Sequence, residues 1–266
     1  MLVKNLVKNL LYSKFRETFP TKNGLLHERS TIGEYRLKKA EENVILTVQL
    51  SGLIISNEHE FLAGSPDGIV NVGNGEKGLL EVKNLFHSKP INLFQAAANK
   101  NFCLEKRQDK LFLKQNHDYY YQCQGLLNVG NFQVLDFVVC TINPYQLFIQ
   151  RIERDLNLWN NVMLPRLTAF YRFAILPELA CPREGKSSGI REPGVWILDG
   201  KTKMVQRAFK DDMGIDRGYV RIDVQMNNTC RLDDIFTCLL PAITRSPSIY
   251  IHQQRQLRQN GSRLFS

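Results

Sequence analysis

The feature that most constrains the fold is a pair of apolar stretches on either side of a glycine-rich turn. Residues 68–72 and 79–85 are rich in valine, isoleucine and leucine, and residues 73–78 contain three glycines. Apolar runs that flank such a turn are typical of a β-hairpin. The sequence therefore predicts two antiparallel strands here.

The second strand of this hairpin carries two charges in an otherwise apolar run, Leu79-Leu80-Glu81-Val82-Lys83. Side chains alternate between the two faces of a strand, so Glu81 and Lys83 share one face, and Leu80 and Val82 share the other. The apolar face belongs in a core. The charged face must meet either water or a functional site, and charges on solvated strands are common enough that this motif alone favours water.

An aspartate, Asp67, lies in a Pro-Asp-Gly turn directly before the first strand. Strand pairing would bring its carboxylate near that of Glu81, and two such groups repel unless a cation lies between them. Because Mg²⁺ takes carboxylate and carbonyl oxygens, Asp67, Glu81 and the Val82 carbonyl are candidate ligands. Beside a bound phosphodiester, Lys83 would orient the nucleophile or stabilise developing charge.

The rest of the chain has the periodicity of an α/β domain with a mixed central sheet flanked by helices. Between the hairpin and the later elements, residues 96–114 are charged and poorly periodic. Asn116 is the expected N-cap of the helix that follows. Helices are expected over residues 3–19, 30–42, 116–129 and 155–174, and further strands over residues 44–48, 52–55, 61–64, 133–142 and 145–152.

The composition of the chain changes after Pro182. Residues 183–189 are polar and glycine-containing, as in a linker, and only short β-like pieces and a basic, glutamine-rich end follow. We therefore expect an α/β domain over residues 1–184 and a C-terminal extension of unassigned role over residues 185–266, in part disordered.

The charge balance indicates polyanionic partners. The formal net charge is +9 and the pI is about 9.3. Such a balance favours nucleic acid first and acidic membrane surfaces second, although many soluble proteins are basic without a specific reason. No apolar run of about twenty residues is present, so no membrane span is expected.

The six cysteines have no metal-finger spacing and no CxxC pair. Several of them lie in apolar runs, as Cys140 does after Val138 and Val139. This usage is typical of buried free thiols and predicts an intracellular, reducing compartment.

Three sets of motifs are more specific in combination than any one of them is alone. They are GSPDG at residues 64–68 with LLEVK at 79–83, HDYYYQCQG at 117–125, and DFVVCT at 136–141. Together they resemble the PD-(D/E)xK nucleases and, more narrowly, the YqaJ viral recombinase family with its phage lambda exonuclease relatives. The resemblance covers about residues 2–183. It implies a restriction-endonuclease-like core and a DNA exonuclease of recombination or repair that depends on Mg²⁺, with Mn²⁺ as the alternative.

The resemblance assigns roles to particular side chains. Asp67 and Glu81 match the metal carboxylates, Lys83 matches the catalytic lysine, and Gln122 matches the active-site glutamine of the tyrosine-rich helix. An ordinary exposed amide is the alternative for Gln122. Gln124 points elsewhere on the same helix and is the weaker candidate.

Family members also place a glutamate from an early helix close to the metals. Residues 26–35, LHERSTIGEY, supply this segment, and Glu34 is the candidate. The family's upstream Trp-x-x-x-Arg segment and Ser/Thr-rich element, which bind the DNA end, would precede residue 1. The domain is therefore expected to be N-terminally shortened.

Two function classes stay open. One is a Mg²⁺-dependent deoxyribonuclease that acts on DNA ends, and the other is a nucleic-acid-binding module that keeps the nuclease fold but has lost turnover. A metabolic α/β enzyme lacks support, because the sequence has no phosphate-cradling glycine-rich loop and no nucleophile elbow. A homo-oligomer is compatible with the family, which includes a ring-forming trimer.

Overall fold

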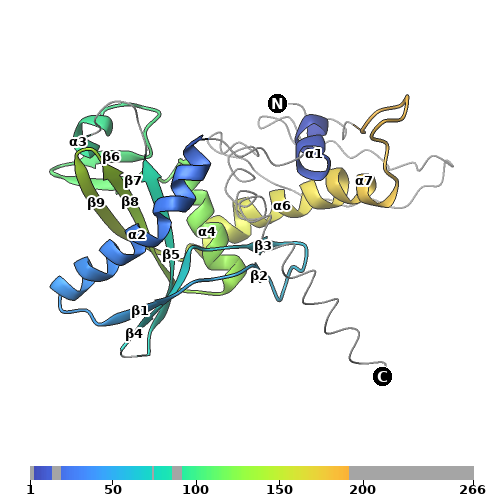
Figure 1. The fold of residues 1–266 in the computed structure, drawn as a ribbon. Helices are drawn as coiled ribbons and strands as arrows, with labels where there is room; N and C mark the ends of the chain where they lie inside the picture. The colour runs from blue at the N-terminus through green and yellow to red at the C-terminus, as the bar shows by residue number, and fades with distance from the viewer. Residues whose placement is uncertain (1–2, 14–18, 74, 86–91, 192–266) are drawn as a thin grey trace, which may run out of the picture. The chain divides into compact units, whose positions relative to one another are not determined.

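The structure is a computed structural model (Figure 1). Its described residues fall into two compact units, of which residues 3–13 with 156–191 form the smaller and residues within 19–155 form the larger. The extension predicted from residue 185 lies almost entirely outside the described part, so its boundary stays a prediction. The described residues are 3–13, 19–73, 75–85 and 92–191.

A five-stranded mixed sheet forms the centre of the larger unit. The central strands β5 and β8 are parallel, and every other neighbouring pair is antiparallel. Helices lie on the sheet, so the predicted α/β class with a mixed central sheet is confirmed. Across the sheet the order is β1 (Leu46–Gln49), β4 (Gly68–Val72), β5 (Lys77–Leu85), β8 (Val134–Ile142) and β9 (Tyr145–Glu153).

The predicted hairpin is the β4–β5 pair. Gly68 lies opposite Leu80 in this pair, and the neighbouring strand β1 approaches it closely. A Cβ atom on Gly68 would lie 2.7 Å from Val48 Cγ1 and 3.3 Å from the carbonyl oxygen of Gln49. The close packing of β1 on β4 therefore requires a glycine here.

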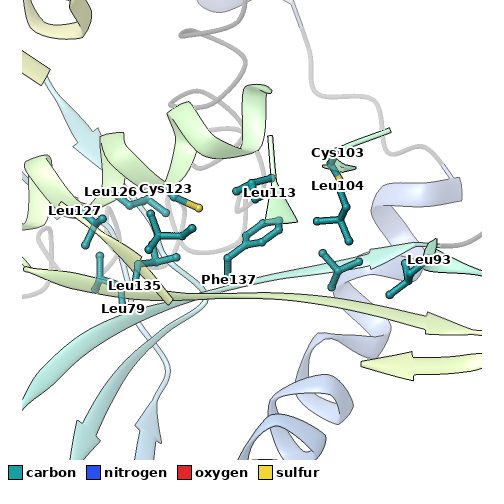
Figure 2. Close-up of a cluster of buried hydrophobic side chains, with 12 residues drawn as sticks. Leu79, Leu93, Cys103, Leu104, Leu113, Cys123, Leu126, Leu127, Leu135 and Phe137 are labelled. Carbon is teal, nitrogen blue, oxygen red and sulfur yellow. The ribbon is translucent and has the colours of Figure 1, made fainter. Parts of the chain in front are cut away.

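One face of the sheet is covered by helix α4 (Asp118–Gly130) and by a small hairpin of β6 (Leu104–Arg107) and β7 (Lys110–Leu113). Figure 2 shows leucine and cysteine side chains of α4 directed at β5 and β8. The buried members of this cluster are Leu79, Leu93, Cys103, Leu104, Leu113, Cys123, Leu126, Leu127, Leu135, Phe137, Val139 and Ile152.

The opposite face is covered by helix α2 (Phe19–Glu41), which crosses the sheet in Figure 1. Ile32 and Tyr35 of α2 pack there against Leu80, Val82 and Val138. The alternation predicted for β5 is therefore confirmed, because its even-numbered residues enter the core beneath α2.

Helix α2 is longer than the sequence predicted. It begins at Phe19 rather than at residue 30, whereas α1 (Val3–Leu11) ends before the predicted residue 19. Proline at the start of a helix lacks only an N–H that the helix would not use, and its fixed φ suits the first turn. Pro20 therefore lies at the start of a helix and not, as predicted from the sequence, at the end of one.

Three further elements differ from the prediction. Residues 96–114, expected to be irregular, contain the β6–β7 hairpin after the short helix α3 (Leu93–Ala96). The N-cap of α4 is His117 rather than Asn116, and its Nδ1 accepts a hydrogen bond from the backbone N–H of Tyr119 at 3.1 Å. The strands β2 (Ile54–Ile55) and β3 (Ala63–Gly64) are shorter than expected.

The last described helix runs continuously from Leu156 to Ala180 and exceeds the predicted end at residue 174. It alternates α-helical turns with two π turns, and Pro165 and Pro177 each lie two residues after a π turn ends. A π turn shifts the hydrogen-bond ladder where a proline offers no N–H. Its parts are α5 (Leu156–Leu158), η1 (Trp159–Met163), α6 (Leu164–Phe170), η2 (Tyr171–Ile175) and α7 (Leu176–Ala180).

Two expectations concern the chain as a whole. Among the described residues, none of the helices combines the length and the apolar character needed to cross a membrane. The thiols of Cys103, Cys123 and Cys140 are free and buried as predicted, and Cys181 is free and exposed. Cys230 and Cys238 lie outside the described residues.

We expect Gly68→Ala to lower the free energy of unfolding by about 1–3 kcal/mol, because the added methyl group forces β1 away from β4. The control is Gly33→Ala in α2, where an added Cβ meets nothing within 4 Å. That variant should gain about 0.5–1 kcal/mol from the lower entropy of the unfolded chain. Urea denaturation measures both, and a Gly68→Ala protein as stable as the wild type would contradict the packing described here.

Candidate active site

Asp67 is fixed against β5 by two hydrogen bonds. Its backbone N–H donates to the carbonyl of Leu80 at 3.0 Å, and its Oδ2 accepts from the N–H of Val82 at 2.7 Å. The side chain thus continues the β4–β5 ladder beyond Gly68. This contact holds the carboxylate of Asp67 directly beside the strand that carries the predicted charge pair.

Glu81 and Lys83 lie together on the face of β5 that meets α4. Lys83 Nζ is 2.5 Å from Glu81 Oε1, and the two residues are only 4% and 1% exposed, respectively. Leu80 and Val82 are buried on the other face. A solvated strand face is therefore ruled out for this pair, because both charges are inside the protein.

Gln122 reaches the same carboxylate from α4. Its Nε2 donates to Glu81 Oε1 at 2.6 Å, so this one oxygen accepts from both the amide and the ammonium of Lys83. Glu81 Oε2 is buried and has no hydrogen-bond partner among the described residues. An unsatisfied buried carboxylate oxygen is costly, and a bound ion is one arrangement that would satisfy it. Glu178 Oε2 in the smaller unit is also buried and unsatisfied.

Gln124 has a different task. Its Nε2 donates to the carbonyl of Glu153 at 2.8 Å, and its Oε1 accepts from the N–H of Asp155 at 2.8 Å. These bonds attach α4 to the end of β9. Of the two glutamines in the tyrosine-rich helix, only Gln122 therefore contacts the charge pair.

The electrostatics of the site are unfavourable for a second carboxylate charge. Desolvation, followed by the charges of Glu81 and Glu28, raises the pKa of Asp67 well above its usual range. The Lys83 charge and the Val82 N–H act in the opposite direction without cancelling this shift. Burial and the neighbouring acids therefore favour the neutral form of Asp67 over a second buried carboxylate charge.

Glu34 does not take the position expected of it. It accepts a hydrogen bond from the Tyr145 hydroxyl at 3.0 Å. Burial raises the pKa of the Cys140 thiol, and the charge of Glu34 adds to this shift. No contact described in the structure joins Glu34 to Asp67 or Glu81. Its side chain lies instead at the end of the β8–β9 hairpin.

Glu28 is the α2 carboxylate whose charge reaches Asp67. It precedes Ile32 by four residues and Tyr35 by seven, and this spacing puts all three on one face of a helix. The spacing of Glu28, Ile32 and Tyr35 is visible in the sequence, but it indicates a shared face only if the helix begins before Glu28. A helix predicted to start at residue 30 does not include Glu28.

The residues present fit a hard divalent cation in part. Asp67 and Glu81 supply two carboxylates, of which one oxygen is buried and unpaired, and the Val82 backbone lies between Glu81 and Lys83. Oxygen donors of this kind suit Mg²⁺ or Mn²⁺. Within the described ranges, no three His, Cys, Asp or Glu side chains come close enough together to hold a metal ion.

The mixed sheet, its flanking helices and the buried acid–lysine pair define a restriction-endonuclease-like α/β core. Residues 8–133 match the family model of the YqaJ-like viral recombinase domain. The resemblance inferred from the motifs is therefore confirmed over these residues. The matched segment includes Asp67, Glu81, Lys83 and Gln122.

Solved structures give a weaker similarity. A crystal structure of an alkaline exonuclease (LHK-Exo) from Laribacter hongkongensis is 20% identical, with a TM-score of 0.38 over 67% of this chain and 76% of that chain. The structure of LHK-Exo in complex with dAMP is 21% identical, with a TM-score of 0.43 over 67% and 83% of the two chains. No curated protein matches this chain.

We expect Asp67→Asn to stabilise the metal-free protein at neutral pH. The pKa of Asp67 is higher in the folded than in the unfolded chain, so its favourable contribution is complete only below the unfolded pKa and is lost as pH rises through the folded pKa. The amide keeps an oxygen for the Val82 N–H and removes the repulsion, a gain of roughly 1.4 kcal/mol for each unit of raised pKa.

Thermal denaturation in EDTA between pH 4 and pH 8 measures this effect. The gain should grow with pH and should be absent from Asp109→Asn, because the Asp109 side chain is fully exposed beside Lys106. Equal stability of wild type and Asp67→Asn at pH 8 would show that Asp67 carries no electrostatic penalty.

Proposed function

We propose that this protein is a divalent-metal-dependent DNA exonuclease of recombination or repair. The observation that carries the proposal is the buried Glu81–Lys83 pair, with Asp67 beside it and one Glu81 oxygen unsatisfied. The YqaJ family match supports a nuclease. The net charge of +9 supports a polyanionic substrate such as DNA.

In this proposal Asp67, Glu81 and the Val82 carbonyl hold Mg²⁺, with Mn²⁺ as the alternative ion. When bound, such an ion activates the attacking water and offsets the charge of the scissile phosphate. A cation would also offset the desolvation and the carboxylate repulsion that raise the pKa of Asp67. The charged form of Asp67 is therefore favoured when a cation is bound.

The other two residues orient these ligands and stabilise charge. Gln122 and Lys83 both donate to Glu81 Oε1, which fixes the carboxylate and leaves Oε2 for the ion. The ammonium of Lys83 is the cation of the pair and stays close to the reacting phosphate. It therefore stabilises the negative charge that develops as the phosphodiester is attacked.

A second function is favoured by the incomplete donor set. With two carboxylates and no third side chain at metal-binding distance in the described part of the chain, the domain also fits a nucleic-acid-binding module that has lost turnover. This alternative keeps the positive net charge and the fold. It differs from the nuclease only in whether DNA is cut.

Digestion of DNA separates the two functions. End-labelled linear DNA should be degraded with Mg²⁺ and not with EDTA, and closed circular DNA should stay intact because it has no end. Asp67→Asn should bind Mg²⁺ weakly in calorimetry, whereas Lys83→Met should bind the ion and lose turnover by about 10²–10³-fold. Circular dichroism confirms that each variant is folded.

Binding of linear DNA without cleavage by the wild type would establish the alternative instead. Near-wild-type cleavage by Lys83→Met would remove the lysine from the mechanism. Cleavage of the circle would contradict an exonuclease but not a nuclease.

The early-helix carboxylate has its own matched test. Glu28→Gln should weaken Mg²⁺ binding and turnover by about 10–100-fold, because Glu28 adds negative charge at Asp67. Glu34→Gln, on the same helix, should leave both nearly unchanged because Glu34 contacts Tyr145. The reverse result would assign the metal role to Glu34, as the sequence first indicated.

A further inference from the structure

The first two turns of α4 contact both members of the charge pair. Gln122 donates to Glu81, and the ring of Tyr119 lies under Lys83 with its centroid 4.9 Å from Nζ. Residues three apart on a helix share a face, and residues two apart on a strand do the same. Tyr119 and Gln122 on the helix therefore face Lys83 and Glu81 on the strand, respectively.

The Tyr119 ring is held from two sides. Its centroid lies 5.9 Å from that of Phe137, which is fully buried in β8, and 4.8 Å from that of His117. The backbone N–H of Tyr119 also donates to the capping His117 Nδ1 at 3.1 Å. Because both neighbours are fixed by the core and by the helix cap, the ring offers Lys83 a rigid surface.

An aromatic face attracts an ammonium without neutralising it. Lys83 has a carboxylate on one side and the Tyr119 ring on another, so its flexible side chain is restricted while its charge is preserved. A second carboxylate in place of the ring would neutralise the charge of the ammonium. An aliphatic residue in that place would leave the Lys83 side chain less restricted.

We propose that Tyr119 is a positioning residue that holds the Lys83 ammonium where it meets the phosphodiester. The inference rests on the proposed nuclease function and deepens it. Tyr119 acts through Lys83 and contacts neither the ion nor the substrate in this role. It gives the tyrosine of the family-like motif a task distinct from core packing.

Steady-state kinetics of DNA cleavage test the role. Tyr119→Leu should lower kcat by roughly 5- to 30-fold with an unchanged KM for DNA, because the cation–π contact is lost and the binding surface is not. Tyr119→Phe keeps the ring and should retain most of the activity. Tyr120→Leu, which alters the adjacent half-buried tyrosine, is the matched control and should behave as the wild type does.

A double-mutant cycle separates positioning from packing. In a Lys83→Met background, Tyr119→Leu should cause no further loss of kcat, because the ammonium it acts through is absent. The same fold-loss in both backgrounds, or an equal loss in Tyr119→Phe, would show a merely structural role and overturn the proposal.

An NMR measurement judges the contact without any cleavage. The side-chain ε-protons of Lys83 should show an upfield ring-current shift in the wild type and in Tyr119→Phe, and lose it in Tyr119→Leu. A wild type that cleaves DNA without such a shift overturns the positioning role alone. A wild type that cleaves no DNA overturns the proposed function, and with it the role of Tyr119 in catalysis, whatever the ring-current shift shows.

Discussion

The buried ion pair between Glu81 and Lys83 is the interaction on which the architecture of the larger unit depends. Two charges removed from water need partners, and removal of one member of such a pair typically costs about 3–5 kcal/mol. Gln122 and the Tyr119 ring supply those partners from α4. The helix thus packs on the sheet through polar contacts at its start and through apolar ones along its length, as Figure 2 shows for the latter.

The opposite face of the sheet contains a useful comparison. Asp136 is also a buried carboxylate, but both of its oxygens are satisfied: Oδ2 accepts from the Tyr35 hydroxyl at 2.6 Å, and Oδ1 accepts from Arg151 Nε at 2.9 Å. Asp136 is therefore fully paired, whereas Glu178 of the smaller unit has one buried oxygen without a hydrogen-bond partner among the described residues. Glu81, on the other face, keeps one oxygen unpaired. Of these two acids on neighbouring strands, only Glu81 has a buried oxygen left for a ligand.

Sequence reasoning was most successful where one local rule decides the structure. Strand alternation put Glu81 and Lys83 on one face, and the glycine-rich turn identified the hairpin that brings Asp67 to them. Gln122 has no such local signal, because its partner Glu81 is 41 residues away, and only the motif resemblance indicated it. Glu28 was missed because Pro20 was interpreted as a helix end, which shortened the helix that carries it. The β6–β7 hairpin was missed because four-residue strands show too little periodicity.

The separations along the chain also bear on the order in which the site forms. Glu81 and Lys83 are two residues apart, and the Asp67–Val82 bond spans 15 residues, whereas the Gln122–Glu81 bond spans 41. Contacts that close short loops form at the lower entropic cost and tend to form first. Sequence separation alone therefore favours an order in which the hairpin brings Asp67 and Glu81 together before α4 supplies the amide donor. In that order, a proton or cation that neutralises these acids would favour the hairpin during folding as well as the finished site.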